Sequence, residues 1–87
     1  MEFDRKVTNR LKRIDGQLHG VLRMMDEGQG CQDVITQLSA IRAAVDRTIG
    51  VIVAENLVDC LKEAQANNED VTEVVSQAMQ LVVKSRA

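Results

Sequence analysis

Residues 31–60 read CQDVITQLSAIRAAVDRTIGVIVAENLVDC, with no proline and with Gly50 as their only glycine. Apolar residues recur along this stretch at helical spacing, which predicts one long helix that continues to near Asn67. At about 100° per residue, Asn56 and Cys60 lie within roughly 20° of the line that Cys31 defines along the helix. Both cysteines and Asn56 therefore share one face, which we expect to be buried.

The two thiols of one chain cannot meet along such a helix. They would be roughly 44 Å apart at about 1.5 Å per residue, whereas a disulfide needs Cα atoms within about 7 Å. If two copies of the helix pack antiparallel about a midpoint near Val45 and Asp46, each Cys31 lies beside Cys60 of the other copy. A symmetric dimer has this self-complementary geometry, so the spacing predicts two identical sulfur sites.

The composition predicts a small all-α protein. The 87 residues include one aromatic residue and 45% apolar residues, and we expect a single domain, 1–87, that gains stability by oligomerising. No stretch reaches 18 uninterrupted apolar residues, and the first 13 residues lack the apolar core of a signal peptide. Two cysteines that cannot pair within a chain do not form a secreted disulfide framework. We therefore expect a cytoplasmic protein without a membrane partner.

Two further helices flank the long one. The first runs from near Asp4 to Asp26 or Glu27, and its apolar residues alternate steps of four and three. Gly28 is a natural residue to end it, and the short connection to Cys31 predicts an antiparallel helical hairpin. The apolar run Ile49–Ala54 read alone also suits a buried strand, but the surrounding helical pattern argues against that reading.

The third helix follows Asn67–Asp70, which supplies a cap. Its wide apolar stripe predicts a further subunit contact, and hence a tetramer built from two dimers. The expected fold is thus an all-α, three-helix protomer that forms an antiparallel four-helix-bundle dimer. The stripe comprises Val71, Val75, Ala78 and Val82 and is widened by Val74, Met79 and Leu81.

A basic stripe lies beside the apolar face of the first helix. Between Arg5 and Ile14 there are five basic residues and no acidic one. Such a patch on an acidic protein is compatible with contacts to DNA phosphates or bases, although an exposed solubilising flank has the same pattern. The members of the stripe are Lys6, Arg10, Arg13 and Gln17.

Three interpretations compete for the group formed by Cys31, Asn56 and Cys60. The cysteines can be small buried hydrophobes, thiolate ligands of Cu(I) or Zn(II), or a redox pair held across a subunit interface. An amide such as that of Asn56 is a poor ligand for a soft metal. Cys31 falls in the first turn of its helix, which favours an anion, so it is the candidate attacking thiol and Cys60 the resolving one. The lone His19 is assigned no role.

Several motifs resemble those of the copper-sensitive operon repressor (CsoR/RcnR) family. Residues 10–17, RLKRIDGQ, are similar to the family signature RLxRIxGQ, and the segments around Cys31 (CQDVITQLSA) and before Cys60 (ENLVDC) also match. The resemblance covers almost the whole chain. It implies a flat D2 tetramer that represses transcription without a helix-turn-helix and releases double-stranded operator DNA when an inducer binds between subunits.

The residue at position 56 departs from the copper-sensing pattern. The resemblance implies a Cys-His-Cys set for Cu(I) with the histidine four residues before the second cysteine, where this chain has Asn56. A chain with both cysteines and no histidine at this position resembles instead the CstR branch, the CsoR-like sulfurtransferase repressors. In that branch, persulfides and polysulfides link the two cysteines between subunits by di-, tri- or tetrasulfide bridges. The resemblance implies several histidines for members that sense nickel or cobalt, and an N-terminal proline for members that sense formaldehyde. This chain has one histidine and no proline.

The resemblance also assigns site residues. Arg10 and Arg47 match positions implicated in operator binding, and Lys12, Arg13 and Gln17 lie in the signature, while Lys6 is added from the helical geometry. We therefore expect a repressor, not an enzyme, that has no metal or cofactor and derepresses sulfide detoxification genes in response to inorganic polysulfide or low-molecular-weight persulfides. The alternatives are a Cu(I)- or other metal-responsive repressor and, from a different class, a thiol enzyme that carries sulfane sulfur.

Overall fold

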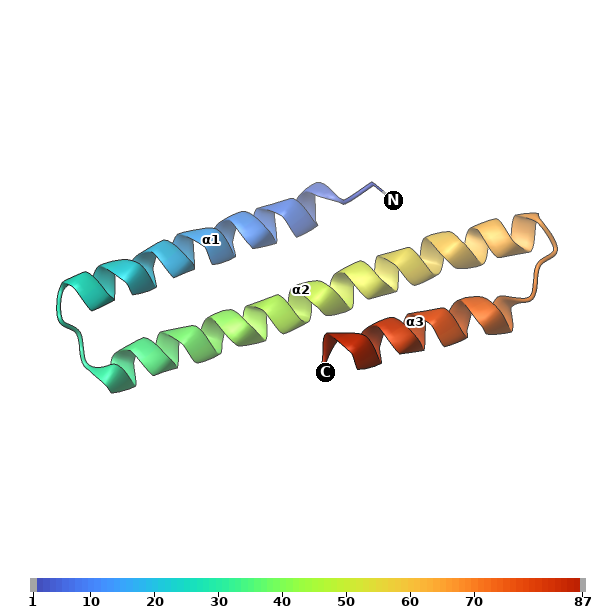
Figure 1. Ribbon diagram of the computed structural model, residues 1–87. Coiled ribbons are helices and arrows are strands. Elements are labelled where there is room, and N and C mark those ends of the chain that lie inside the picture. The colour runs from blue at the N-terminus through green and yellow to red at the C-terminus, as the bar shows by residue number, and fades with distance from the viewer. Residues whose placement is uncertain (1, 87) are drawn as a thin grey trace. The chain divides into compact units, whose positions relative to one another are not determined.

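The computed structural model describes residues 2–86 as three α-helices, with no strand among them. The helices are α1 (Arg5–Asp26), α2 (Cys31–Ala66) and α3 (Val71–Ser85), joined by two short connections (Figure 1). All three sequence-predicted helices are confirmed, and the all-α class with them. The run Ile49–Ala54 is helical, as part of α2.

Two aspartates begin α1 and α3 in the same way. The side chain of Asp4 accepts a hydrogen bond from the backbone N–H of Lys6 at 3.0 Å, and that of Asp70 accepts one from Thr72 at 2.9 Å. Each bond satisfies a backbone donor that has no partner within its helix. The predicted starts of both helices are therefore confirmed by a specific cap.

The two connections between the helices also share one backbone conformation and hydrogen-bond pattern. Gly28 and Asn68 both have positive φ angles, +73° and +55°. In each case the next residue donates its N–H to a carbonyl five residues earlier, Gln29 to Met24 at 2.9 Å and Glu69 to Ala64 at 2.8 Å. This is the bonding of a Schellman motif, in which a left-handed residue ends the helix. The role predicted for Gly28 is confirmed.

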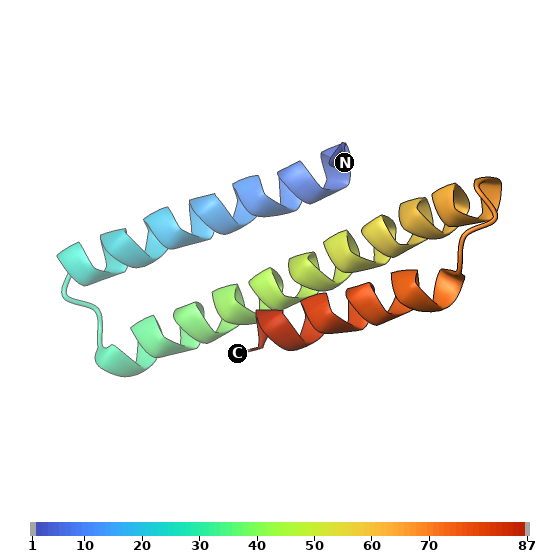
Figure 2. The same cartoon turned by 45° about the vertical axis from the view of Figure 1, so that its right-hand side comes forward.

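The chain divides into two compact units, residues 2–48 and 49–86, with the boundary inside α2. In the first unit, α1 runs back along the first part of α2 (Figure 2). Ile14, Val21 and Ile41 form its buried cluster, with Val34 and Ala44 packed against it.

Only part of the apolar stripe of α1 is buried within this unit. Val7, Ile14 and Val21, seven residues apart, are at most 7% exposed, whereas Leu11 and Leu18 are more than 40% exposed. The neighbouring helix α2 covers only one side of the apolar stripe of α1 and leaves the other side uncovered. The outer edge of α1 is therefore free for a further contact.

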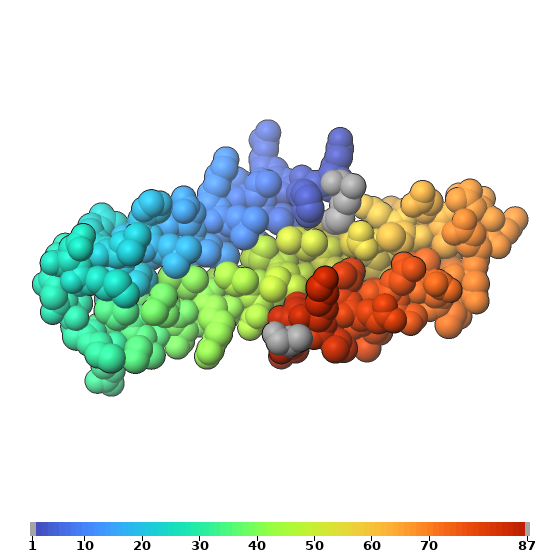
Figure 3. Space-filling model, in the orientation of Figure 1, coloured from blue at the N-terminus to red at the C-terminus, as the bar shows by residue number. Residues whose placement is uncertain are grey.

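In the second unit, α3 folds back against the later part of α2, and the space-filling view shows the two in continuous contact (Figure 3). Ala64 and Ala78 are its buried apolar residues. Several large side chains on α3 remain more than 40% exposed, among them Val75, Met79 and Val83. Within residues 2–86, no helix is both long enough and apolar enough to cross a membrane.

Candidate functional sites

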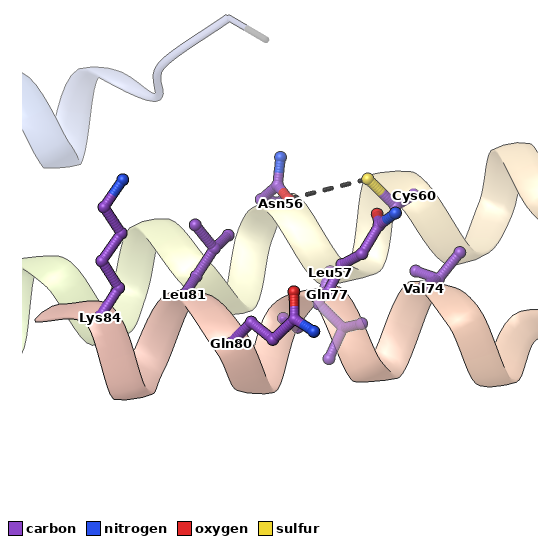
Figure 4. Close-up of a pocket in the computed structure, with 9 residues that line it drawn as sticks. Asn56, Leu57, Cys60, Val74, Gln77, Gln80, Leu81 and Lys84 are labelled. Carbon is purple, nitrogen blue, oxygen red and sulfur yellow. Dashed lines mark hydrogen bonds between the residues drawn. The ribbon is translucent and has the colours of Figure 1, made fainter.

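Cys60 and Asn56 lie one turn apart on α2 and contact each other. The thiol of Cys60 donates a hydrogen bond to Oδ1 of Asn56, with Sγ and Oδ1 3.7 Å apart (Figure 4). Both residues are half-buried. The structure thus brings together two of the three sequence-predicted sensing residues.

A groove between α2 and α3 opens beside this pair. Its volume is about 350 Å³, and its wall combines a thiol, three amides, one ammonium group and aliphatic side chains. Because α3 supplies six of the nine lining residues, the spacing along α2 alone could not reveal the groove. The residues that line it are Asn56, Leu57, Cys60, Val74, Gln77, Ala78, Gln80, Leu81 and Lys84.

Cys31 is the first residue of α2 and belongs to the other compact unit. Its side chain is exposed, and both cysteines are free thiols. The carbonyl of Gly30, the residue before Cys31, accepts the N–H groups of Asp33 and Val34 at 3.1 and 3.2 Å and so forms the first hydrogen bonds of the helix. In the single chain Cys31 is therefore exposed, whereas the sequence predicted that the face it shares with Asn56 and Cys60 is buried.

The basic residues of α1 form a second candidate site. A shallow hollow of about 280 Å³ is lined by Lys6, Asn9, Arg10 and Arg13. Three of these four residues are in the sequence-predicted stripe, and all are exposed.

Sequence reasoning missed Asn9, although the signal was present. Asn9 lies three residues after Lys6 and four before Arg13, which places it on their face of the helix. Its amide can both donate and accept hydrogen bonds. Lys12 and Gln17 are exposed on α1 outside the hollow, and Arg47 is exposed on α2.

Within the described part of the chain, no three His, Cys, Asp or Glu side chains come together as a metal site would require. The lone His19 instead lies 3.5 Å from the carboxylate of Asp15, one turn earlier on α1. Both side chains are exposed, at 68% and 72%. This contact is an ordinary pair on a helix surface.

An all-α fold, a basic surface on α1 and two free cysteines suit a small helical transcriptional regulator. A family model described as a metal-sensitive transcriptional repressor matches residues 4–84, which is nearly the whole chain. The chain belongs to this family, the CsoR/RcnR repressors, whose members are transcriptional repressors and not enzymes. The resemblance of the sequence motifs to this family is thus confirmed.

Three curated relatives illustrate the similarity. The chain is 46% identical over 63 residues to the uncharacterised protein YrkD of Bacillus subtilis, covering 72% of this chain and all of YrkD. It is 34% identical to the copper-sensing repressor CsoR of Bacillus subtilis, over 68% of this chain and 58% of CsoR. It is 39% identical to the copper-sensing repressor RicR of Mycobacterium tuberculosis, over 66% of this chain and 59% of RicR. The chain therefore spans about three-fifths of these two copper sensors.

A solved structure shows the same fold. The nickel-responsive transcriptional regulator InrS superimposes with a TM-score of 0.79 at 29% sequence identity, covering 95% of this chain and 92% of that one. The three-helix fold of this chain is therefore shared with InrS.

Proposed function

We propose that this repressor senses persulfides and polysulfides through Cys31 and Cys60 and releases its operator when the two thiols become linked between subunits. Membership of the repressor family supports the DNA-binding half of the proposal. The observation that carries the sensing half is the Asn56–Cys60 pair, in which an amide oxygen, not an imidazole, faces the thiol at 3.7 Å.

This pair suits sulfur chemistry better than Cu(I) binding. Cu(I) prefers thiolate, thioether and imidazole ligands, and an amide oxygen supplies none of these. Loss of the nitrogen ligand leaves two thiols, which is the set that thiol–disulfide exchange needs. The structural features at Cys60 therefore favour a reactive sulfur species as inducer.

Intersubunit linkage requires an oligomer, and the exposed apolar surface supports one. Fifteen large apolar side chains of the described residues are at least 36% exposed in the single chain. Small domains bury such surface by association. In the proposed dimer, two α2 helices pack antiparallel so that Cys31 lies beside Cys60 of the partner subunit, and two such dimers form the tetramer.

The proposed reaction takes place in two exchange steps. The thiolate of Cys31 attacks the outer sulfur of a persulfide, R–S–SH, so that Cys31–S–SH forms and R–S⁻ departs with the electron pair of the broken bond. The thiolate of Cys60 from the partner subunit then attacks Sγ of Cys31, and HS⁻ departs to leave a disulfide. Attack on a longer sulfur chain at Cys31 leaves a tri- or tetrasulfide. The persulfide is the oxidant, so no other is needed.

DNA binding is assigned to the basic surface of α1 together with Arg47. Lys6, Arg10 and Arg13 line one hollow, where a phosphate oxygen would meet several donors at once. Lys12 and Gln17 are exposed on the same helix and complete the proposed DNA-binding set. We propose that the whole chain acts as one DNA-binding and inducer-sensing domain in the cytoplasm. An effect of the linkage on operator affinity of about 1–3 kcal/mol is typical of allosteric coupling.

Intact mass after treatment with polysulfide, under denaturing and non-reducing conditions, tests the sensing half. We expect covalent dimers in the wild type, linked by a disulfide or carrying added multiples of the sulfur mass, and none in Cys31→Ser or Cys60→Ser. Both variants should still bind operator DNA but no longer release it. Unmodified wild-type monomers, or a Cys31→Ser protein that still responds, would refute the proposal.

A Cu(I)-responsive repressor is the second candidate, because the family is metal-sensitive and CsoR and RicR are copper sensors. A Cu(I) titration followed by operator release separates the two functions. Release by stoichiometric Cu(I), with no response to polysulfide, would establish the metal sensor.

A further inference from the structure

The proposed function uses Cys60 and Asn56 but leaves the other wall of their groove without a role. That wall is α3, which contributes the amides of Gln77 and Gln80 and the ammonium group of Lys84. The close-up shows Lys84 and Asn56 extending from their helices toward the side on which the Cys60 sulfur lies (Figure 4). These polar groups line the same groove as a thiol that we have assigned to sensing, with Lys84 and Cys60 toward opposite ends of it (Figure 4).

The groove owes its depth to a small residue. Ala78 is 8% exposed and is the buried member of the lining, between the larger Val74 and Leu81 on the same helix. The volume of about 350 Å³ lies at the small end of ligand sites, which commonly span roughly 300–1,000 Å³. The space suits a molecule of a few heavy atoms more readily than a peptide.

The charge of the lining selects the sign of the ligand. Lys84 is the one formally charged residue among those that line the groove, and no carboxylate is present to neutralise it. The three amides add hydrogen-bond donors for an anion. A small anion with a terminal sulfur therefore matches both the charge and the thiol.

We propose that this groove is the recognition subsite for a small anionic sulfane-sulfur donor and that Lys84 determines its specificity. The inference rests on the proposed sensing function and names the class of inducer that the site accepts. Inorganic polysulfide and cysteine persulfide share the chemistry, since each is a short sulfur chain that ends in a negatively charged sulfur.

The bound donor would react by the first step given above. The thiolate of Cys31, which the proposed dimer places beside Cys60 of the other subunit, forms a bond to the sulfane sulfur, the S–S bond of the donor breaks, and its electron pair stays on the departing sulfur. That leaving group is an anion, and Lys84 with the neighbouring amides stabilises it in the groove. Lys84 thus assists both the arrival of the donor and the departure of the leaving group.

The test compares rates of intersubunit crosslinking in three variants and the wild type. Lys84→Gln removes the charge, Lys84→Arg keeps it, and Arg86→Gln removes a cation that follows α3 but does not line the groove. The donors are sodium tetrasulfide, cysteine persulfide and the neutral dimethyl trisulfide. We expect Lys84→Gln to slow the anionic donors by about 3–10-fold and to leave the neutral donor unchanged. Lys84→Arg and Arg86→Gln should react like the wild type.

Salt supplies a second readout, since higher ionic strength should slow the wild type with tetrasulfide and have less effect on Lys84→Gln. A defect of Lys84→Gln with only one of the anionic donors would support the subsite and identify which donor it serves. If Lys84→Gln slowed dimethyl trisulfide as much as the anions, or slowed neither anion, the proposed subsite would be overturned. The crosslink formed by the wild type would in that case still support the sensor. A wild type that forms no crosslink with any donor would refute the sensor, and the subsite with it.

Discussion

The two compact units of this chain differ in what they bury and in their charge. Residues 2–48 bury the branched side chains of Val7, Ile14, Val21 and Ile41, whereas residues 49–86 bury only Ala64 and Ala78 among their apolar residues. The first unit carries eight basic and seven acidic residues, and the second three basic and six acidic. The unit with the basic hollow contains a cluster of buried branched side chains, whereas the buried apolar side chains of the unit with Cys60 are both alanines.

The largest expected difference concerns stability. Ile14→Ala should cost about 2–4 kcal/mol of unfolding free energy because it leaves a cavity in the buried cluster. Val74→Ala, at a half-buried position of α3, should cost about 1 kcal/mol or less. Chemical denaturation of both variants at one protein concentration gives the comparison. Equal losses would show that the second unit is packed as tightly as the first.

The next effect concerns DNA. Arg10→Ala should weaken operator binding about tenfold and reduce the salt dependence of the affinity by about one counterion, because one phosphate contact is lost. Lys62→Ala, a matched cation of the second unit, should leave the affinity unchanged. Fluorescence anisotropy with labelled operator at several salt concentrations measures both. A Lys62 variant as weak as the Arg10 variant would remove the functional distinction between the units.

Much of this molecule could be predicted from sequence because its local signals agree. A start near Asp4, a cap within Asn67–Asp70, Gly28 as a terminator and the helical period all indicated the same three helices. The outward half of the α1 stripe could not be predicted, since periodicity defines a stripe but not how much of it one neighbour covers. The groove beside Cys60 depends on which residues of α3 face α2, and no spacing within one helix contains that information.

A smaller effect separates the two connections. Gly28→Ala should destabilise the protein by about 1 kcal/mol, because its φ of +73° is costly for a residue with a Cβ atom. Asn68→Gly should stabilise it by a few tenths of a kcal/mol to about 1 kcal/mol for the same reason. Thermal unfolding of the two variants gives the signs. A stabilising Gly28→Ala would contradict the shared motif.

The smallest effect tests whether helix glycines are kept for close packing. Nothing lies within 4 Å of a Cβ atom built on Gly16 or Gly50. Each change to Ala should therefore stabilise its helix by about 0.5–1 kcal/mol. Unfolding midpoints measured for Gly16→Ala and Gly50→Ala compare the two units directly. A loss of stability at either position would reveal a second helix approaching there in the oligomer.

The spacing of Asn56 and Cys60 has an evolutionary consequence. The codons for asparagine and histidine differ at one nucleotide, and a histidine at position 56 would put an imidazole one helical turn from the thiol. A single point mutation therefore separates this site from the thiol–imidazole set that the resemblance associates with Cu(I). Under the proposed function, the same helix would pass between sulfur and metal specificity without any change of fold.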